Sequence, residues 1–393
     1  MASGYKFPIL NSGGSASSTV VDFEDMFVSK NQFINAGLWS FGYGAKGELG
    51  LSSGTNRSSP TQVGTLTNWK VISAGSYHSA AIKTDGTLWV WGHNGFGQLG
   101  LLDIVHRSSP VQVGTSNNWK LVTCGGYTTA GIMGDGTLWT WGYNVDGMLG
   151  LNDIVHRSSP VQVGSLTTWK KIYSSGYISG GLMSAIKVDN TLWTWGTNTN
   201  GQLGLNDTTH RSSPVQVGSL TSWKSAQCGG IGRIIALRGD GTLWTMGANS
   251  RGELGLNDTT HRSSPVQVGL LTSWKQAISG GNQCLAIADN GTLWAWGQNQ
   301  YGQLGLLDVA HRSSPTQVGS LTSWKQVGKG GTYHSGAVMT DGTLWMFGNN
   351  TNGQLGLNDI VHRSSPVQVG SFVVWKEVTC GGERFSADHT LAI

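Results

Sequence analysis

Residues 69–113 read WKVISAGSYHSAAIKTDGTLWVWGHNGFGQLGLLDIVHRSSPVQV, and variants of this stretch recur along the chain. Short runs rich in apolar and β-branched residues predict four β-strands, at 69–73, 79–82, 88–91 and 111–113. Asp85-Gly86 between the second and third runs is a strong hairpin signal, and Pro110 suits the start of an edge strand. No segment has a sustained period of 3.6 residues, so the unit is predicted to be all-β.

The Trp residues show how often the unit occurs. Eleven of the 18 belong to Leu-Trp motifs: Trp39, Trp89, Trp91, Trp139, Trp141, Trp193, Trp195, Trp244, Trp294, Trp296 and Trp345. The other seven each precede a Lys: Trp69, Trp119, Trp169, Trp223, Trp274, Trp324 and Trp375. The motif recurs after 50, 50, 54, 51, 50 and 51 residues, which gives seven units. Such a period is typical of a solenoid, a propeller or an array. A β-solenoid would need shorter and more uniform coils, so four strands per unit favour a seven-bladed β-propeller of antiparallel blades.

The two ends of the repeat region predict how the ring closes. The first motif, Leu38-Trp39, has no Trp-Lys strand before it, and the last Trp375-Lys376 has no motif after it. We therefore expect the C-terminal strand or strands to complete the blade that the N-terminal strands begin, which removes exposed sheet edges. The propeller is predicted to be one domain over 21–393. Residues 1–20 are predicted to form a tether or linker that could join a larger particle.

Composition excludes several classes of protein. The chain of 393 residues has 60 Gly, about twice the average frequency, but only 8 Pro and 12% charged residues. This argues against a collagen and against a disordered chain. The net charge of +4 is a poor match to a nucleic-acid binder. No apolar run is long enough for a transmembrane helix and no secretory signal is evident, so we expect no membrane partner. Four widely spaced Cys fit neither a disulfide scaffold nor a zinc pair, and no cofactor is expected.

One loop of the unit repeats the same charged residues. Seven Arg precede Ser-Ser-Pro: Arg57, Arg107, Arg157, Arg211, Arg262, Arg312 and Arg363. Six follow a His and have an Asp four residues before them: Asp103, Asp153, Asp207, Asp258, Asp308 and Asp359. The pattern could indicate a metal or acid–base site, but one copy per blade favours an Asp–Arg pair that holds the loop. The first unit lacks both the Asp and the His, so neither is essential.

Another repeated position lies five residues after each Trp-Lys Trp. It holds Ala74, Cys124, Ser174, Cys228, Ser279, Lys329 and Cys380. If the Trp-Lys strand is innermost, these small residues meet near the axis, and the Cys are core residues rather than redox or metal groups. Lys329 is the exception, and it is predicted either to bind an anion in the channel or to reach solvent. The seven Lys that follow Trp are read as repeat features, and the basic residues form no visible stripe.

The order of Leu-Trp-x-Trp-Gly, Gly-x-Asn-x-x-Gly-Gln-Leu-Gly and Arg-Ser-Ser-Pro resembles the repeats of the regulator of chromosome condensation family over roughly 35–393. The resemblance implies a propeller that serves as an interaction platform, and the family's namesake is a nucleotide-exchange factor for the small GTPase Ran. It also implies that a His at the position of His78 or His334 lies on the partner-binding side. The chain departs from that namesake, since no blade carries a long inserted wedge. Its Trp-rich repeats look more like bacterial and marine-phage versions, and residues 21–28 are similar to phage-type leaders.

Variation among the units predicts where a partner binds. In an antiparallel meander, the loops between first and second strands and between third and fourth strands share one face, and these loops differ from copy to copy. The hairpins and interunit links on the other face are nearly identical. A binding surface needs such differences and favours Tyr, Arg and other large side chains. The predicted contacts are Tyr77, His78, Tyr127, Arg233, Tyr333, His334, Arg384 and Phe385 around the axis, and Phe96, Tyr143, Arg251 and Tyr301 outside them. The alternative is neutral drift of ordinary loops.

Three functions remain open from the sequence. The first is a non-catalytic module that binds a protein or a glycan, with a place in a phage virion, in the tail or at the surface, as one setting. The second is a guanine-nucleotide exchange factor for a small GTPase, which rests on fold analogy alone. The third is an enzyme with its site at the channel mouth. The only side chains there that could take part in catalysis are His78, His334, Lys329, Arg233 and Glu383. No nucleophile elbow or phosphate loop occurs, so no catalytic residue is predicted.

Overall fold

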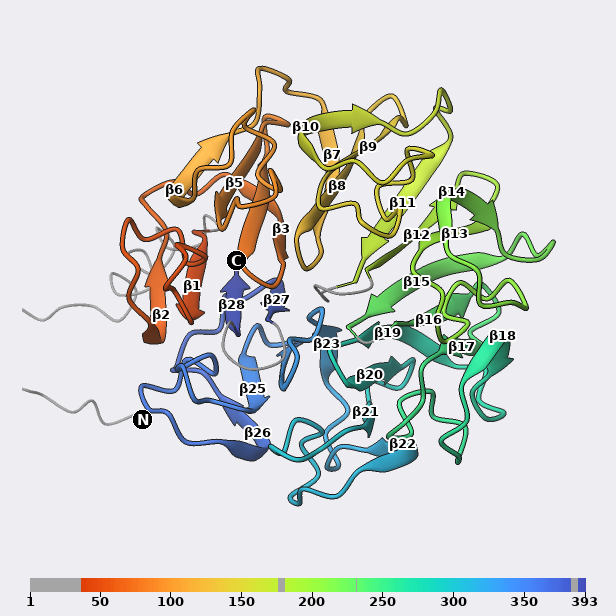
Figure 1. Ribbon diagram of the computed structural model, residues 1–393. Coiled ribbons are helices and arrows are strands. Elements are labelled where there is room, and N and C mark those ends of the chain that lie inside the picture. Colours follow the sequence, from red (N-terminus) through yellow and green to blue (C-terminus); the bar gives the residue numbers. More distant parts are fainter. Residues whose placement is uncertain (1–36, 176–180, 231, 383–387) are drawn as a thin grey trace, which may run out of the picture.

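The computed structural model describes residues 37–175, 181–230, 232–382 and 388–393. These residues form 28 strands and no helix, and the strands make seven four-stranded antiparallel sheets. Figure 1 shows the sheets arranged as blades around a central axis, which confirms the predicted seven-bladed propeller. The part of the chain described here therefore holds no helix that could cross a membrane.

Each blade runs from an inner strand beside the axis to an outer strand at the rim. The inner strands are β3 (Trp69–Ala74), β7 (Trp119–Cys124), β11 (Trp169–Ser174), β15 (Trp223–Gly229), β19 (Trp274–Ser279), β23 (Trp324–Val327) and β27 (Val378–Gly381). The second strands are β4 (His78–Lys83), β8 (Thr128–Met133), β12 (Leu182–Lys187), β16 (Arg233–Arg238), β20 (Gln283–Ala288), β24 (His334–Met339) and β28 (His389–Ala392). The third strands are β5 (Leu88–Gly92), β9 (Leu138–Gly142), β13 (Leu192–Gly196), β17 (Leu243–Gly247), β21 (Leu293–Gly297), β25 (Leu344–Gly348) and β1 (Trp39–Gly42). The outer strands are β6 (Arg107–Gln112), β10 (Arg157–Gln162), β14 (Arg211–Gln216), β18 (Arg262–Gln267), β22 (Arg312–Gln317), β26 (Arg363–Gln368) and β2 (Arg57–Gln62).

We number the blades by their inner strands, from blade 1 (β3–β6) to blade 6 (β23–β26). Blade 7 is built from both ends of the described chain, in the order β2-β1-β28-β27. Strand β28 pairs with β1, placing Ala392 opposite Trp39, and it also pairs with β27. The predicted closure of the ring by N- and C-terminal strands is confirmed.

The apolar core lies between the blades rather than within them. One cluster joins Leu138 and Val163 of blade 2 to Trp169 and Trp195 of blade 3. The Trp195 side chain is fully buried, and its indole N–H donates to the backbone carbonyl of the preceding blade at 3.0 Å. Gly150 adopts φ +70, and a Cβ there would lie 2.8 Å from the Trp195 indole nitrogen. Glycine lets the loop close over the indole ring. The high numbers of Trp and Gly in the chain are therefore linked, because both residue types make this contact.

The repeated Asp, His and Arg residues hold the outer loops. In all six blades that have the Asp, an Asp carboxylate lies 2.5 or 2.6 Å from the Arg four residues later. Each His accepts a backbone N–H of the same loop through Nδ1 at 2.9–3.1 Å. In blade 7, the Arg57 guanidinium donates a hydrogen bond to Thr55 Oγ1 instead of pairing with an Asp. Asn56 stands in place of the His, and its Oδ1 accepts the Gly44 N–H. The predicted structural role is confirmed, and no cluster of three potential metal ligands occurs among the described residues.

Candidate functional site

The second strand of each blade begins on the variable face, and most of its first side chains bond the next blade. His78 Nε2 lies 2.8 Å from Thr129 Oγ1. Because the Thr129 hydroxyl donates to the Gln98 carbonyl at 2.7 Å, His78 donates to Thr129 through its Nε2–H. Burial lowers the pKa of His78 to about 3, so the ring is neutral at physiological pH. His334 makes the same contact with Thr390 at 3.1 Å. The imidazoles therefore join blade 1 to blade 2 and blade 6 to blade 7.

Arg233 joins blade 4 to blade 5 in the same way. Its guanidinium donates to Ser279 Oγ at 3.0 Å and to the carbonyls of Gly280 and Gly281 at 3.0 and 2.6 Å. Three further contacts extend this arrangement, and together the six form what we call the interblade belt. They are Thr128 with Ser174, Gln283 with the Gly331 and His334 carbonyls, and His389 with Ser79.

Three of the predicted contact residues are buried rather than on the surface. His78 and His334 are 0% exposed and Arg233 is 1% exposed. They are the first residues of β4, β24 and β16, where the side chain faces the adjacent blade, whereas the sequence placed them in loops. Their side chains are therefore not open to the surface of this face in the structure. Two other predicted contacts, Arg384 and Phe385, lie outside the described residues.

Four other predicted residues form one aromatic surface over blades 1 and 2. The rings of Tyr77 and Tyr127 are stacked, with centroids 5.7 Å apart and planes 13° apart. Phe96 lies 4.9 Å from Tyr127 and 4.9 Å from Tyr143. All four side chains are partly exposed. Residues that are distant along the chain thus form a continuous aromatic cluster on the variable face.

Two His side chains also belong to this cluster, and neither is among the predicted contacts. His93 lies 5.3 Å from Tyr127, and His156 lies 4.9 Å from Tyr143 in a stacked arrangement. Burial, with the charge of His106, lowers the pKa of His93 to about 4, so His93 is neutral at physiological pH. His156 was read only as a repeated loop residue, and His93 was noted only as a variable position. The repeat pattern alone did not reveal the contact between these loops.

The remaining predicted residues lie on the other side of the ring. Tyr301 contacts Tyr333 at 5.0 Å and His362 at 5.4 Å, and Tyr333 is 8% exposed. Arg251 is partly exposed, and its backbone N–H is held by the Glu253 carboxylate at 2.7 Å. The structure therefore gathers four of the predicted residues into one larger cluster and pairs Tyr301 with Tyr333.

The neutral state of His78 predicts how stability depends on pH. Burial, with the charges of His93, His389 and Lys329, lowers its pKa from 6.5 to about 3. Below pH 6.5, His78 binds a proton in the unfolded chain but not in the folded chain. Its contribution to the free energy of unfolding is therefore complete above that pH and is lost as the pH falls toward 3. The advantage of the wild type over H78Q should shrink by roughly 2 kcal/mol between about pH 7.5 and about pH 5. Urea unfolding of both proteins across this range measures the difference, and parallel stability curves would contradict the assignment.

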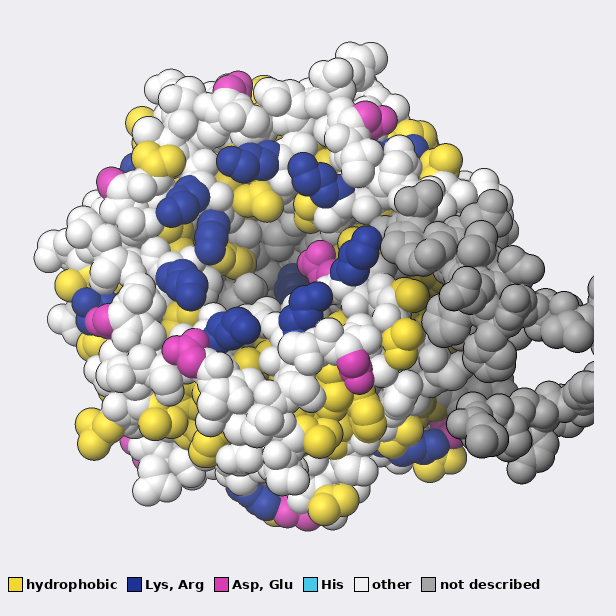
Figure 2. Space-filling model, turned by 180° about the vertical axis from the view of Figure 1, so that it is seen from behind, with side chains coloured by type: hydrophobic (Ala, Val, Ile, Leu, Met, Phe, Trp, Pro, Cys, Tyr) yellow, Lys and Arg dark blue, Asp and Glu magenta, His cyan; other side chains and the backbone are white. Residues whose placement is uncertain are grey.

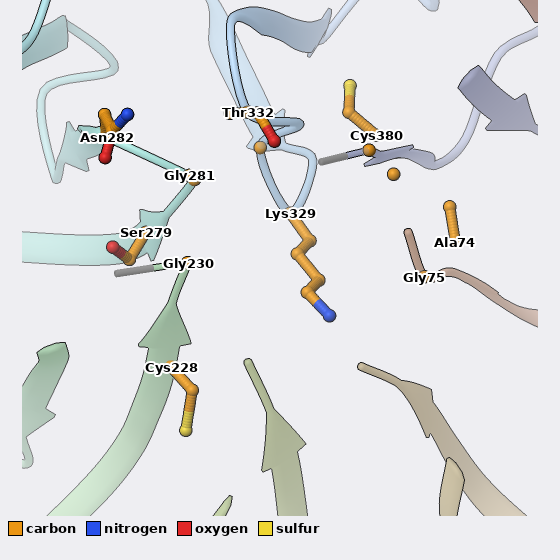
Figure 3. A pocket seen from close by; sticks show the side chains of 14 residues that line it. Ala74, Gly75, Cys228, Gly230, Ser279, Gly281, Asn282, Lys329, Thr332 and Cys380 are labelled. Carbon is orange, nitrogen blue, oxygen red and sulfur yellow. The ribbon is translucent and has the colours of Figure 1, made fainter. Parts of the chain in front are cut away.

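The axial channel is narrow where Lys329 enters it (Figure 3). The Lys329 ammonium donates to the Cys124 carbonyl of blade 2 at 2.6 Å, so it spans the axis. The cavity beside it has a volume of about 20 Å³, enough for about one water molecule. Burial lowers the pKa of Lys329 and raises the pKa of Cys124 and Cys228 to about 12. The thiols are thus buried core groups, and Lys329, which is partly exposed, bonds a carbonyl across the channel.

One group of side chains has the order of a catalytic triad. Asp388 Oδ2 lies 3.5 Å from His334 Nδ1, and His334 Nε2 lies 3.1 Å from Thr390 Oγ1. All three residues are buried, and the Thr390 hydroxyl donates to a backbone carbonyl. His334 belongs to the interblade belt, so this group also takes part in the contact between blades 6 and 7.

The opposite face carries a basic ring that the sequence did not reveal. Figure 2 shows Lys and Arg side chains arranged around the central opening. In six blades the second residue of the inner strand is an exposed Lys, and in blade 7 an exposed Lys lies two residues before β27: Lys70, Lys120, Lys170, Lys224, Lys275, Lys325 and Lys376. The expectation that the basic residues form no stripe is therefore wrong, because the fold carries residues about 50 positions apart to one end of the channel.

Comparisons with known proteins agree with the architecture. A model of the regulator of chromosome condensation (RCC1) repeat matches seven consecutive segments: 35–82, 85–132, 135–182, 189–230, 240–287, 290–338 and 341–393. A second model of the repeat matches 69–98, 119–147 and 325–354. The human X-linked retinitis pigmentosa GTPase regulator is 37% identical over 194 residues, which are 48% of this chain and 14% of that protein. Human HERC3, a probable E3 ubiquitin-protein ligase, is 39% identical over 93 residues, or 23% of this chain and 9% of that protein. The chain thus matches only a small part of these relatives' length.

Solved structures share the whole ring. Prp20p of Saccharomyces cerevisiae superimposes with a TM-score of 0.79 at 18% identity, covering 92% of this chain and 94% of Prp20p. Human WBSCR16 superimposes with a TM-score of 0.78 at 18% identity, covering 91% of this chain and 98% of WBSCR16. Identities this low show the fold alone.

Proposed function

Because the chain belongs to the regulator of chromosome condensation repeat family, we propose that it is a non-catalytic propeller that binds a protein partner on its variable face. The aromatic cluster of Tyr77, Phe96, Tyr127 and Tyr143, with His93 and His156, is the main contact surface. Arg251 and Tyr301 form a secondary contact. Residues 384 and 385 are included in the proposed surface because of their position in the repeat.

The aromatic cluster is the observation that carries this proposal. Large rings that are partly exposed and already packed against each other lose little side-chain entropy when a partner covers them. Tyr is one of the residue types that dominate binding energy at protein interfaces. The interblade belt lies beneath the rings and fixes the strands that present them. The surface is therefore rigid before a partner binds.

The relatives support a protein as the partner. Prp20p of yeast has been studied for its binding to Gsp1p and histones, and the yeast RCC1 protein has been crystallised bound to Kap60. All of these partners are proteins. A glycan remains the alternative ligand, since aromatic surfaces also pack against sugars, and a glycan array tests it separately.

Alanine substitutions in the cluster test the proposal. The variant Y77A/F96A/Y127A/Y143A should lose at least about tenfold in affinity for a partner identified by cross-linking in the native source, because removing several interface hot spots costs more than 1.4 kcal/mol. Surface plasmon resonance with the purified partner measures the change. R251A/Y301A is the control on the other side of the ring and should lose less. Equal affinity of wild type and the fourfold variant, with unchanged melting temperatures, would disprove the proposed surface.

A second candidate is regulation of a small GTPase. It is favoured by the similarity to a GTPase regulator over nearly half of the chain. A nucleotide-release assay with small GTPases from the native source distinguishes catalysed exchange from binding alone. None of the relatives described above is a phage protein, so a place in a virion stays a prediction that mass spectrometry of purified particles can test.

A further inference from the structure

The basic ring forms the mouth of the channel on the face opposite the variable loops. Its seven Lys, one per blade, each follow a Trp, which begins the innermost strand in blades 1–6 and lies three residues before β27 in blade 7. All seven Lys are exposed. Position 74 and its equivalents stand four residues further along these strands, about 13 Å deeper. The ring is therefore separate from the narrow part of the channel that Lys329 crosses. Figure 2 shows the central hollow that the ring surrounds.

The ring lacks nearby neutralising charge. None of its seven Lys makes an ion pair within the described part of the chain, and Lys170 alone has a side-chain bond there, to Asn190 Oδ1 at 2.9 Å. Lys171 stands just inside the ring and donates to the Lys224 carbonyl at 2.6 Å. Burial, with the charges of Lys170 and Lys224, lowers the pKa of Lys171. Positive groups at this mouth thus repel one another, and an anion on the axis would relieve the repulsion.

Most carboxylates of this face are arranged outside the ring. Six lie in the hairpins between second and third strands: Asp85, Asp135, Asp189, Asp240, Asp289 and Asp341. Since neighbouring strands are about 5 Å apart, these carboxylates lie roughly one to two strand spacings farther from the axis than the Lys. Glu377 follows Lys376 directly and precedes β27, the inner strand of blade 7. Burial raises the pKa of Glu377 to about 7, so it opposes the ring with only part of a charge at neutral pH.

We propose that the basic ring binds a compact polyanion, a small molecule that carries several phosphate groups and sits on the axis. Such a ligand meets the inner Lys without approaching the outer Asp. A membrane or a DNA duplex would cover the whole face and meet both charges. Lys is suited to this role because each ammonium is a mobile point charge with three donors, and several can converge on different phosphates.

Titration with inositol hexakisphosphate tests the site in the full-length protein. Isothermal titration calorimetry should show one molecule bound per chain, and affinity should fall at least about tenfold as salt rises from about 0.05 M to about 0.3 M. Inositol monophosphate should bind at least about a hundredfold more weakly, because it engages one or two Lys. Absence of saturable binding by the hexakisphosphate would overturn the proposal. Tighter binding of duplex DNA or of phosphatidylserine vesicles would also overturn it, in favour of an extended surface.

Paired substitutions locate the binding to the ring. K120Q/K224Q should weaken hexakisphosphate binding at least about tenfold, whereas K120R/K224R should keep it, because Arg preserves charge and donors. Both positions are exposed, so both variants should have the same melting temperature as the wild type. K46Q removes a charge from the opposite face and controls for net charge when it is compared with K120Q. Equal weakening by K46Q and K120Q would overturn the placement of the site on the ring.

Discussion

Deleting residues 389–393 is expected to abolish the cooperative folding of the whole propeller. The deletion removes β28 (His389–Ala392), which pairs with β1 on one side and β27 on the other, and Ile393. Leu391 and Ile393 become buried in the core between blades 7 and 1, at about 1.5–3 kcal/mol for each side chain. Every ladder hydrogen bond of β28 is lost as well. The total approaches the 5–15 kcal/mol that stabilises a typical native protein. Circular dichroism melting should show a broad or absent transition.

A circular permutant separates the loss of the strand from the position of the chain ends. Leu38 and Ile393 flank the paired residues Trp39 and Ala392, so a short Gly-Ser linker can join them. New ends can be opened at Leu270, which is 94% exposed in the link between blades 4 and 5. This permutant keeps all seven blades and should melt cooperatively. A truncated protein that melted like the wild type would show that blade 7 does not need β28.

The second large effect is expected from W195A, at roughly 3–5 kcal/mol of lost unfolding free energy. Trp195 is fully buried between blades 2 and 3, and its indole N–H bonds the Met148 carbonyl. Alanine leaves a cavity between two rigid sheets, and it leaves that carbonyl without its donor. Urea unfolding monitored by far-UV circular dichroism measures the change in free energy.

Two other substitutions serve as controls for W195A. W193A changes the neighbouring Trp on the same strand, which is partly exposed and bonds Thr191 within its own blade, so the loss should be smaller. W195M should also cost less than W195A, because blade 4 carries Met246 at the equivalent position, fully buried. A loss below about 1 kcal/mol for W195A would show that this ring does not support the interface.

The sequence predicted the fold because the same physical constraints recur seven times. Each hairpin has its Asp-Gly or Asp-Asn turn, each blade repeats the Leu-Trp strand, and the unmatched end strands predicted the closure of blade 7. The Asp–Arg pairs could be predicted because both partners stand within one loop. All of these signals are local, or they repeat with a fixed period.

The candidate site was only partly predictable, because its contacts cross between blades. Tyr77, Phe96, Tyr127 and Tyr143 were chosen as variable loop residues, but their packing into one cluster depends on how adjacent blades are placed. His78 and Arg233 have the same residue types as interface hot spots, and only the geometry shows that they face the next blade. The Lys ring was missed for the opposite reason. Its members are identical in every unit, and variation was the only signal used to find a surface.

The interblade belt has a consequence for how seven nearly identical units find their order. Repeat proteins risk pairing the wrong neighbours during folding. The junctions use different pairs, with a His–Thr contact between blades 1 and 2 and between blades 6 and 7, and Arg233 with Ser279 between blades 4 and 5. A unit moved to a junction of another kind would bury an unmatched polar group, which is costly. Polar residues that contribute little to the apolar core thus limit which blades can follow one another.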